Sequence, residues 1–154
     1  MPPMFTRLLA ERLQACSKLK IEEAVDGAQV EAGKVLIAAG DYHLRINRVG
    51  ERVRASLDQS PPENSCRPSV DVLFRSVSEV YGGAALAVIL TGMGQDGLRG
   101  VQSLKARGAY VIAQDQATSV VWGMPGAVVG AGLSDCVTPL GGVVPEILRQ
   151  MGRN

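Results

Sequence analysis

A short apolar run that ends in a glycine-rich segment constrains this fold more than any other feature. The run, residues 84–90, carries no charge and is partly β-branched, which predicts a strand buried on both faces of a parallel sheet. Residues 91–97 follow with three glycines around one carboxylate, Asp96, and a helix is expected over 98–106. Loops between a parallel strand and the next helix are where open α/β sheets bind ligands.

The second half of the chain repeats this alternation of strand and helix. Ser69 is placed to cap a helix that ends near residue 80, where Gly82 can adopt a left-handed conformation. Residues 109–113 predict another buried strand, Pro125 can begin a helix, and the last helix is expected over about 143–151. The alternation predicts an α/β fold with a doubly wound, mostly parallel sheet and helices on both faces.

The first part of the chain predicts a helix followed by a β-hairpin excursion. Thr6 is expected to cap a helix to about residue 18, whose apolar face comprises Phe5, Leu8, Leu9 and Leu13 with the stem of Arg12. Strands are expected over 35–39, 43–49 and 52–57, with a tight turn after Val49 and a bulge beside it. Residues 59–68 form a surface connection, so residues 1–154 are expected to be a single domain.

Composition excludes several function classes. Sixteen basic and fifteen acidic residues give a net charge of +1 without any block of like charge, so nucleic acid is not an expected partner. Three widely spaced cysteines predict free thiols rather than a disulfide frame or a metal site. No signal segment and no apolar run of about 18 residues occurs, so we expect a soluble cytoplasmic protein without direct membrane insertion.

The loop at residues 91–97 is open to three interpretations. Residues 92–97 match G-x-G-x-x-G, and Asp115 follows 18 residues later, as in dinucleotide sites; the charge of Asp96 would repel a pyrophosphate there. Alternatively, Asp96 orients a histidine that activates a serine or cysteine, while the Met93 amide faces a developing oxyanion. In the plainest interpretation the glycines only close a turn, and Asp96 caps the helix after it.

Motifs along nearly the whole chain resemble the catalytic domain of bacterial chemotaxis protein-glutamate methylesterases. The most specific are Thr-Gly-Met-Gly-x-Asp-Gly at residues 91–97 and Pro-Ser-Val-Asp at 68–71. The matching residues are 1–3, 5–6, 11–13, 23–24, 26–27, 40, 43–44, 68–71, 73–74, 90–94, 96–97 and 123–125.

The resemblance implies a serine hydrolase that needs neither cofactor nor metal. Such an enzyme removes methyl groups from glutamate methyl esters on the cytoplasmic domains of chemoreceptors, and can deamidate particular glutamines. In the family a serine, a histidine and an aspartate form the triad, and Asp96 falls on the aspartate. The backbone amide of Met93 falls on an oxyanion-hole donor.

The sequence departs from the family pattern at its start. The family's serine lies in a Gly-x-Ser turn and its histidine directly precedes the segment that matches Met1, so both are missing, together with the first strands and the receiver domain. We therefore expect the C-terminal part of a methylesterase catalytic domain, N-terminally truncated and inactive alone.

Residues that are present offer poor substitutes for the missing catalytic groups. His43 is expected to be structural or exposed, Ser119 to cap a helix, and Asp71 to stabilise the dipole of its own helix. The alternatives are a non-catalytic receptor-interaction remnant and, less favoured, a nucleotide-binding oxidoreductase.

Overall fold

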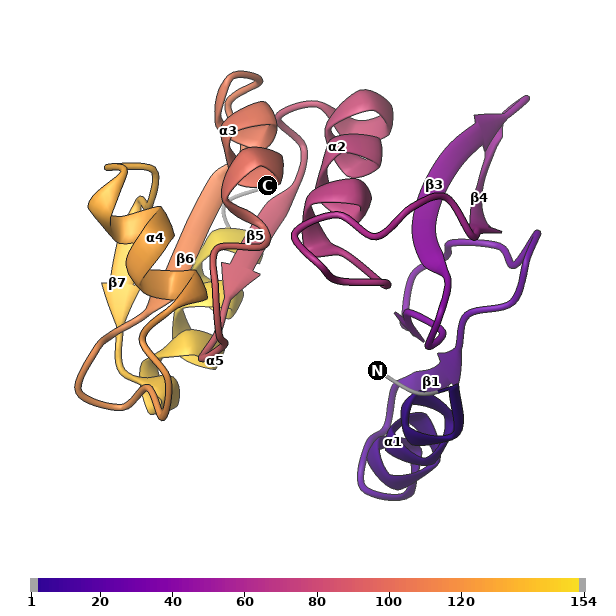
Figure 1. Cartoon of the computed structure of the whole chain (residues 1–154), viewed down its shortest axis with the longest axis horizontal. Helices are drawn as coiled ribbons and strands as arrows, with labels where there is room; N and C mark the ends of the chain where they lie inside the picture. The colour runs from indigo at the N-terminus through magenta and orange to yellow at the C-terminus, as the bar shows by residue number, and fades with distance from the viewer. Residues whose placement is uncertain (1–2, 153–154) are drawn as a thin grey trace.

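A computed structural model describes residues 3–152 (Figure 1). The elements in chain order are α1 (Pro3–Ala15), β1 (Lys20–Glu23), β2 (Lys34–Ile37), β3 (His43–Val49), β4 (Arg52–Asp58), α2 (Val70–Tyr81), β5 (Leu86–Ile89), α3 (Leu98–Lys105), β6 (Tyr110–Gln114), α4 (Met124–Gly130), β7 (Cys136–Thr138) and α5 (Leu140–Met151). The predicted α/β class, with parallel strands and a hairpin, is confirmed.

The described strands form three sheets rather than one continuous sheet. β1 and β2 pair in parallel, β3 and β4 form the antiparallel hairpin, and β5, β6 and β7 form a parallel sheet in that order. Helix α2 lies between the three-stranded sheet and the hairpin, and it contacts both α3 and β3 (Figure 1). This position brings the start of α2 to the loop that follows β5.

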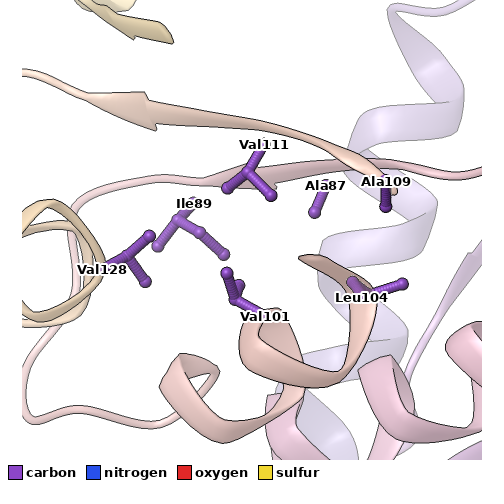
Figure 2. Packing of buried hydrophobic residues seen from close by; sticks show 7 residues of the cluster. All are labelled: Ala87, Ile89, Val101, Leu104, Ala109, Val111 and Val128. Atoms are coloured by element: carbon purple, nitrogen blue, oxygen red, sulfur yellow. The ribbon is translucent and has the colours of Figure 1, made fainter. Parts of the chain in front are cut away.

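The main apolar core lies between the three-stranded sheet and the helices α3 and α4. Figure 2 shows side chains from β5 and β6 facing side chains from both helices. The buried members of this core are Ala87, Ile89, Val101, Leu104, Ala109, Val111 and Val128, each at most 4% exposed. Burying a valine, leucine or isoleucine contributes roughly 1.5–3 kcal/mol. The core therefore fixes the end of β5 and the start of α3, and with them the loop between.

The hairpin is regular, contrary to the expected bulge. Its register runs without interruption from His43 opposite Asp58 to Val49 opposite Arg52. Gly50 turns the chain at φ 62°, as predicted. Val49 breaks the alternation of the sequence only because it points into solvent, at 58% exposure.

Two short strands escaped prediction because their sequences carry little pattern. β1 is four residues long and mostly charged, and β7 is three residues long. Each is held by a parallel neighbour, β2 and β6 respectively, so tertiary pairing rather than propensity decides their conformation.

Helix α1 packs through a different side than expected. Thr6 does not cap α1, because it lies within the helix rather than before it. Its side chain is buried, and the hydroxyl donates to Glu23 Oε1 (2.5 Å) and accepts from the Gly40 amide (2.9 Å). Thr6 and Ala10 are small enough to bring the helix close to β1. The expected apolar face, Phe5, Leu8, Leu9 and Leu13, is 37–57% exposed, so that prediction was wrong about packing.

The remaining helices follow the sequence closely. α2 ends at Gly82, which has φ 57°, and Pro125 lies in the first turn of α4; both were predicted. α5 begins at Leu140, three residues earlier than expected. Within residues 3–152 no helix has the length and apolar character needed to cross a membrane.

Candidate active site

Helices α2 and α3 begin side by side, and two carboxylates link their starts. Asp96, which precedes α3, accepts hydrogen bonds from the Val70 amide (2.7 Å, Oδ2) and the Asp71 amide (3.1 Å, Oδ1) of α2. Asp71 in turn accepts from the Gly100 amide of α3 (2.7 Å). Each carboxylate thus satisfies free amides at the positive end of the opposite helix. Asp96 therefore caps mainly the preceding helix rather than the one after it, and Asp71, in the first turn of α2 as expected, also acts across to α3.

The two oxygens of the Asp96 carboxylate have unequal numbers of donors. Oδ1 accepts from the Ser69 hydroxyl (2.7 Å), and from Asn64 Nδ2, the Asp71 amide and the Gly97 amide, each at 3.1 Å. Within residues 3–152, Oδ2 accepts only from the Val70 amide. Since each carboxylate oxygen offers about two lone-pair sites, Oδ2 keeps one acceptor site open although Asp96 is only 5% exposed. Ser69 stands at the N-cap position as predicted, but its hydroxyl serves Asp96 instead of its own helix.

The loop before Asp96 is held at its start, by Thr91 and Gly92. The Thr91 amide donates to Gln114 Oε1 (2.8 Å), and the Thr91 hydroxyl accepts from the Val121 amide (2.8 Å). The Gly92 carbonyl accepts from the amides of Gly123 (3.1 Å) and Met124 (2.8 Å). These bonds join the start of the loop to residues 121–124, so the two segments form one hydrogen-bonded unit.

Within this unit the backbone amide of Met93 is left without an acceptor, so it can donate a hydrogen bond to a bound molecule. Among residues 3–152 it donates to no acceptor, and the Met93 side chain is 83% exposed. The neighbouring contact depends on glycine: a Cβ at Gly123 would lie 2.6 Å from the Gly92 oxygen and 2.8 Å from the Gly94 nitrogen. The sequence pattern marked Met93 but gave no sign that Gly123 closes the loop against a second segment.

His43 is structural. It is fully buried, its Nδ1 accepts from the Ser69 amide (3.2 Å) and its Nε2 lies 3.1 Å from the Pro61 carbonyl. An accepting Nδ1 and a carbonyl at Nε2 require the tautomer protonated on Nε2. Both ring nitrogens are therefore occupied, and His43 is closed to substrate as a base.

The other candidate residues are bound within their own segments. The Ser119 hydroxyl donates to the Asp115 carbonyl (2.7 Å), so Ser119 does not cap a helix as expected. The Asp115 carboxylate accepts from the amide (2.9 Å) and hydroxyl (2.6 Å) of Thr118. Both bonds end on the same oxygen, Asp115 Oδ1, and hold the turn that follows β6.

The cysteines are free thiols, as predicted. Burial raises the pKa of Cys66, with the nearby charge of Asp96 as a second cause, and burial raises the pKa of Cys136. Raised pKa values disfavour the thiolate that nucleophilic attack requires. Among the described residues no three His, Cys, Asp or Glu side chains are grouped to hold a metal ion.

The sequence prediction missed Asn64, a donor to both linking carboxylates. Its Nδ2 lies 2.8 Å from Asp71 Oδ2 and 3.1 Å from Asp96 Oδ1. Asn64 lies in the proline-rich connection, where an asparagine is ordinary turn chemistry, so no sequence signal distinguished it.

The fold and this site define an α/β protein whose buried polar centre lies at the carboxyl end of a parallel strand, beside a rigid glycine loop. Comparison with protein families identifies it further: residues 1–147 match the CheB methylesterase family, and the chain belongs to that family. The family is one of methylesterases, so membership disfavours the dinucleotide-site interpretation of the loop.

Individual relatives of this chain carry names that agree with the family match. The chain is 53% identical over 152 residues to a protein-glutamate methylesterase/protein-glutamine glutaminase of Trichodesmium erythraeum, covering 99% of this chain and 43% of the relative. A Nocardioides protein of the same name is 52% identical over 153 residues, covering 99% and 42%. The chain thus spans less than half the length of these curated relatives.

A solved structure matches closely. The CheB methylesterase catalytic domain of Thermotoga maritima superimposes with a TM-score of 0.95 at 42% identity, over 97% of this chain and 79% of that domain. The α/β arrangement around the loop is therefore that of a methylesterase catalytic domain.

Proposed function

We propose that this chain supplies the orienting aspartate, Asp96, and an oxyanion-hole donor, the Met93 amide, of a protein-glutamate methylesterase. The substrates would be glutamate methyl esters, and selected glutamine amides, on the cytoplasmic domains of chemoreceptors. The named activity of the relatives supports this class of reaction. One observation carries the proposal: among the described residues, Asp96 Oδ1 has four donors, whereas Oδ2 has one donor and an open acceptor site.

Asp96 would act by holding a histidine in one orientation. Its surrounding donors fix the carboxylate, so the open site on Oδ2 has a defined direction for an imidazole N–H. A histidine held this way takes the proton of a serine hydroxyl as that oxygen attacks the ester carbonyl, and it then protonates the leaving methanol. Water hydrolyses the acyl-enzyme by the same proton transfers in reverse order.

The Met93 amide would stabilise the oxyanion that forms at the ester carbonyl. An oxyanion-hole donor must be free in the resting protein and rigidly placed. The Met93 amide has no acceptor within the described residues, and its neighbour Gly92 is held through both its amide and its carbonyl. The Met93 amide therefore does not have to break another hydrogen bond when negative charge develops on the substrate oxygen.

The residues present set a limit on activity. The only histidine of the 154 residues, His43, is buried with both nitrogens occupied. We therefore expect the chain alone to be inactive, with the serine and histidine supplied by polypeptide outside this sequence. A receiver domain and a cytoplasmic location belong to the same proposal.

A chimaera tests the proposal. In this protein, called the chimaera below, residues 1–154 replace the segment that they match in the Thermotoga maritima catalytic domain. Methanol release from methylated chemoreceptor fragments is measured for the chimaera and for the 154-residue chain. We expect turnover by the chimaera only, and its loss on Asp96→Asn.

Two results would contradict the assignment. One is turnover by the 154-residue chain that survives Asp96→Ala, because that activity would come from another centre. The other is a folded chimaera that binds receptor fragments but releases no methanol, which would support the non-catalytic receptor-interaction alternative.

A further inference from the structure

Asn64 lies between the two buried carboxylates that link α2 and α3. Its Nδ2 donates to Asp71 Oδ2 (2.8 Å) and to Asp96 Oδ1 (3.1 Å). Asp71 and Asp96 are 1% and 5% exposed. Ionised carboxylates only accept hydrogen bonds, so the NH₂ end of the amide, rather than its oxygen, must face both. One neutral group thus holds two like charges together.

We propose that Asn64 is a positioning residue for Asp96: it fixes the rotation of the carboxylate so that Oδ2 faces the catalytic histidine. The catalytic consequence rests on the function proposed above, whereas the geometric effect on Asp96 does not. The other donors to Oδ1 are the Ser69 hydroxyl and the amides of Asp71 and Gly97. They come from the start of α2 and from the loop itself, so within residues 3–152 Asn64 is the one donor to Oδ1 from a third segment.

The turn that carries Asn64 is itself anchored. Asn64 has φ 52°, and the turn is closed by two hydrogen bonds between the backbones of Glu63 and Cys66 (3.1 and 2.9 Å). Glu63 also binds Arg75 of α2 through two bonds, Nη1 to Oε1 at 2.7 Å and Nη2 to Oε2 at 2.5 Å. A bidentate ion pair of this kind fixes geometry as well as charge. The turn that carries Asn64 is therefore bound to α2, the helix whose first amides donate hydrogen bonds to Asp96.

Asn64 also joins the two carboxylate links into one network. Asp71 Oδ1 accepts from the Gly100 amide of α3, while Asp71 Oδ2 accepts from Asn64. Loss of the amide would leave two buried carboxylates facing each other without a shared donor, and their repulsion is substantial where water is excluded. Replacement by aspartate would add a third negative charge at the same place.

The kinetic test uses the chimaera with N64A, N64S and N64D. Because a misplaced orienting group slows the chemical step without weakening substrate binding, we expect kcat to fall about 10-fold for N64A and N64S and about 100-fold for N64D, with KM changed less than about twofold. The matched control is N47A on the hairpin, where Asn47 Nδ2 donates to Ser56 Oγ (2.7 Å) at the exposed surface. N47A is expected to leave kcat unchanged.

A second measurement needs no catalysis. In the 154-residue chain, the proton NMR shifts of the Asp71 and Gly97 amides report their bonds to Asp96 Oδ1. We expect N64A and N64S to move both signals and N47A to move neither. Should the chimaera be inactive, the proposed function fails while these shifts still decide whether Asn64 positions Asp96. Unmoved amide signals, or an unchanged kcat in an active chimaera carrying N64A, would overturn the inference.

Discussion

Asp96 and His43 are both buried beside Ser69, yet they have opposite relations to their surroundings. The Ser69 hydroxyl donates to Asp96, and the Ser69 amide donates to His43. Both nitrogens of His43 are occupied by groups of the same fold, whereas Asp96 Oδ2 keeps an open acceptor site. The comparison teaches that an unused lone pair, rather than burial or polar neighbours, distinguishes Asp96, the proposed orienting group, from the structural His43.

The same comparison explains why a serine, a histidine and an aspartate in contact here do not form a triad. In a triad the histidine lies between the other two residues and accepts the serine proton. Here Ser69 lies between, is 2% exposed, and directs its hydroxyl at the aspartate. Proximity of the three residue types is therefore insufficient evidence for hydrolysis.

The largest expected effect comes from removing the charge of Asp96. Asp96→Asn in the chimaera should lower kcat/KM by about 10³-fold or more, because the histidine loses its orienting acceptor. Methanol release measures the change. The control Asp58→Asn, in the exposed ion pair with Arg45, should stay within about twofold. A loss of less than about tenfold for Asp96→Asn would place the orienting group elsewhere.

Closing the glycine contact should have the next largest effect. Gly123→Ala would place a Cβ against the backbone of Gly92 and Gly94, so the Met93 loop must shift. We expect a loss of about 10²-fold in kcat, the size seen on losing one oxyanion-hole donor. Gly130→Ala, at the last residue of α4, meets nothing within 4 Å among the described residues and should leave kcat unchanged. Equal effects of the two substitutions would indicate general destabilisation instead.

His43 should matter for stability and not for the chemical step. His43→Ala removes a fully buried ring and two hydrogen bonds, so urea unfolding of the 154-residue chain should show a loss of about 2–4 kcal/mol. The neighbouring Tyr42→Ala, at a side chain 37% exposed, should cost about 1 kcal/mol or less. If His43→Ala in the chimaera lowered kcat as strongly as Asp96→Asn, the structural role would be refuted.

The smallest expected effect is on the pH dependence of stability, and it comes from Glu146, a carboxylate distant in sequence from both Asp96 and His43. Hydrogen bonds from Arg149, then Gln150 and Tyr110, lower the pKa of Glu146 from its usual value of 4.5 to about 2. A lowered folded-state pKa stabilises the protein above the unfolded pKa and loses that contribution as pH falls from about 4.5 to 2. Glu146→Gln should therefore flatten the fall in urea midpoint between pH 5 and 2. Glu51→Gln, in the exposed hairpin turn, should leave the slope unaltered.

Local pattern predicted much of the fold because local forces decide those parts. The apolar run before residue 91, the helix after it and the hairpin around Gly50 are each decided by alternation or by turn chemistry. The face of α1 could not be predicted, since Phe5 and Leu8 look like core residues until the segment that packs on the helix is known. β1 and β7 were missed because pairing with a neighbour, and not composition, makes them strands.

In the candidate site, too, some residues could be predicted from local sequence and others could not. Asp96 and Met93 were identified from the glycine loop and its family resemblance, and the structure adds the hydrogen-bond inventory that separates their free groups from bound ones. Asn64 and Gln114 could not be found in advance, because each acts through a contact with a residue more than twenty positions away. Long-range polar contacts of this kind leave no periodic trace in a sequence.

The central claim is that the open site on Asp96 Oδ2 receives the catalytic histidine. A crystal structure of the active chimaera tests it most directly through one distance, from Oδ2 to the nearest nitrogen of a histidine outside residues 1–154. We predict about 2.6–3.2 Å, a normal hydrogen bond. An imidazole bound to another acceptor, with Oδ2 facing water or a different donor, would contradict the account.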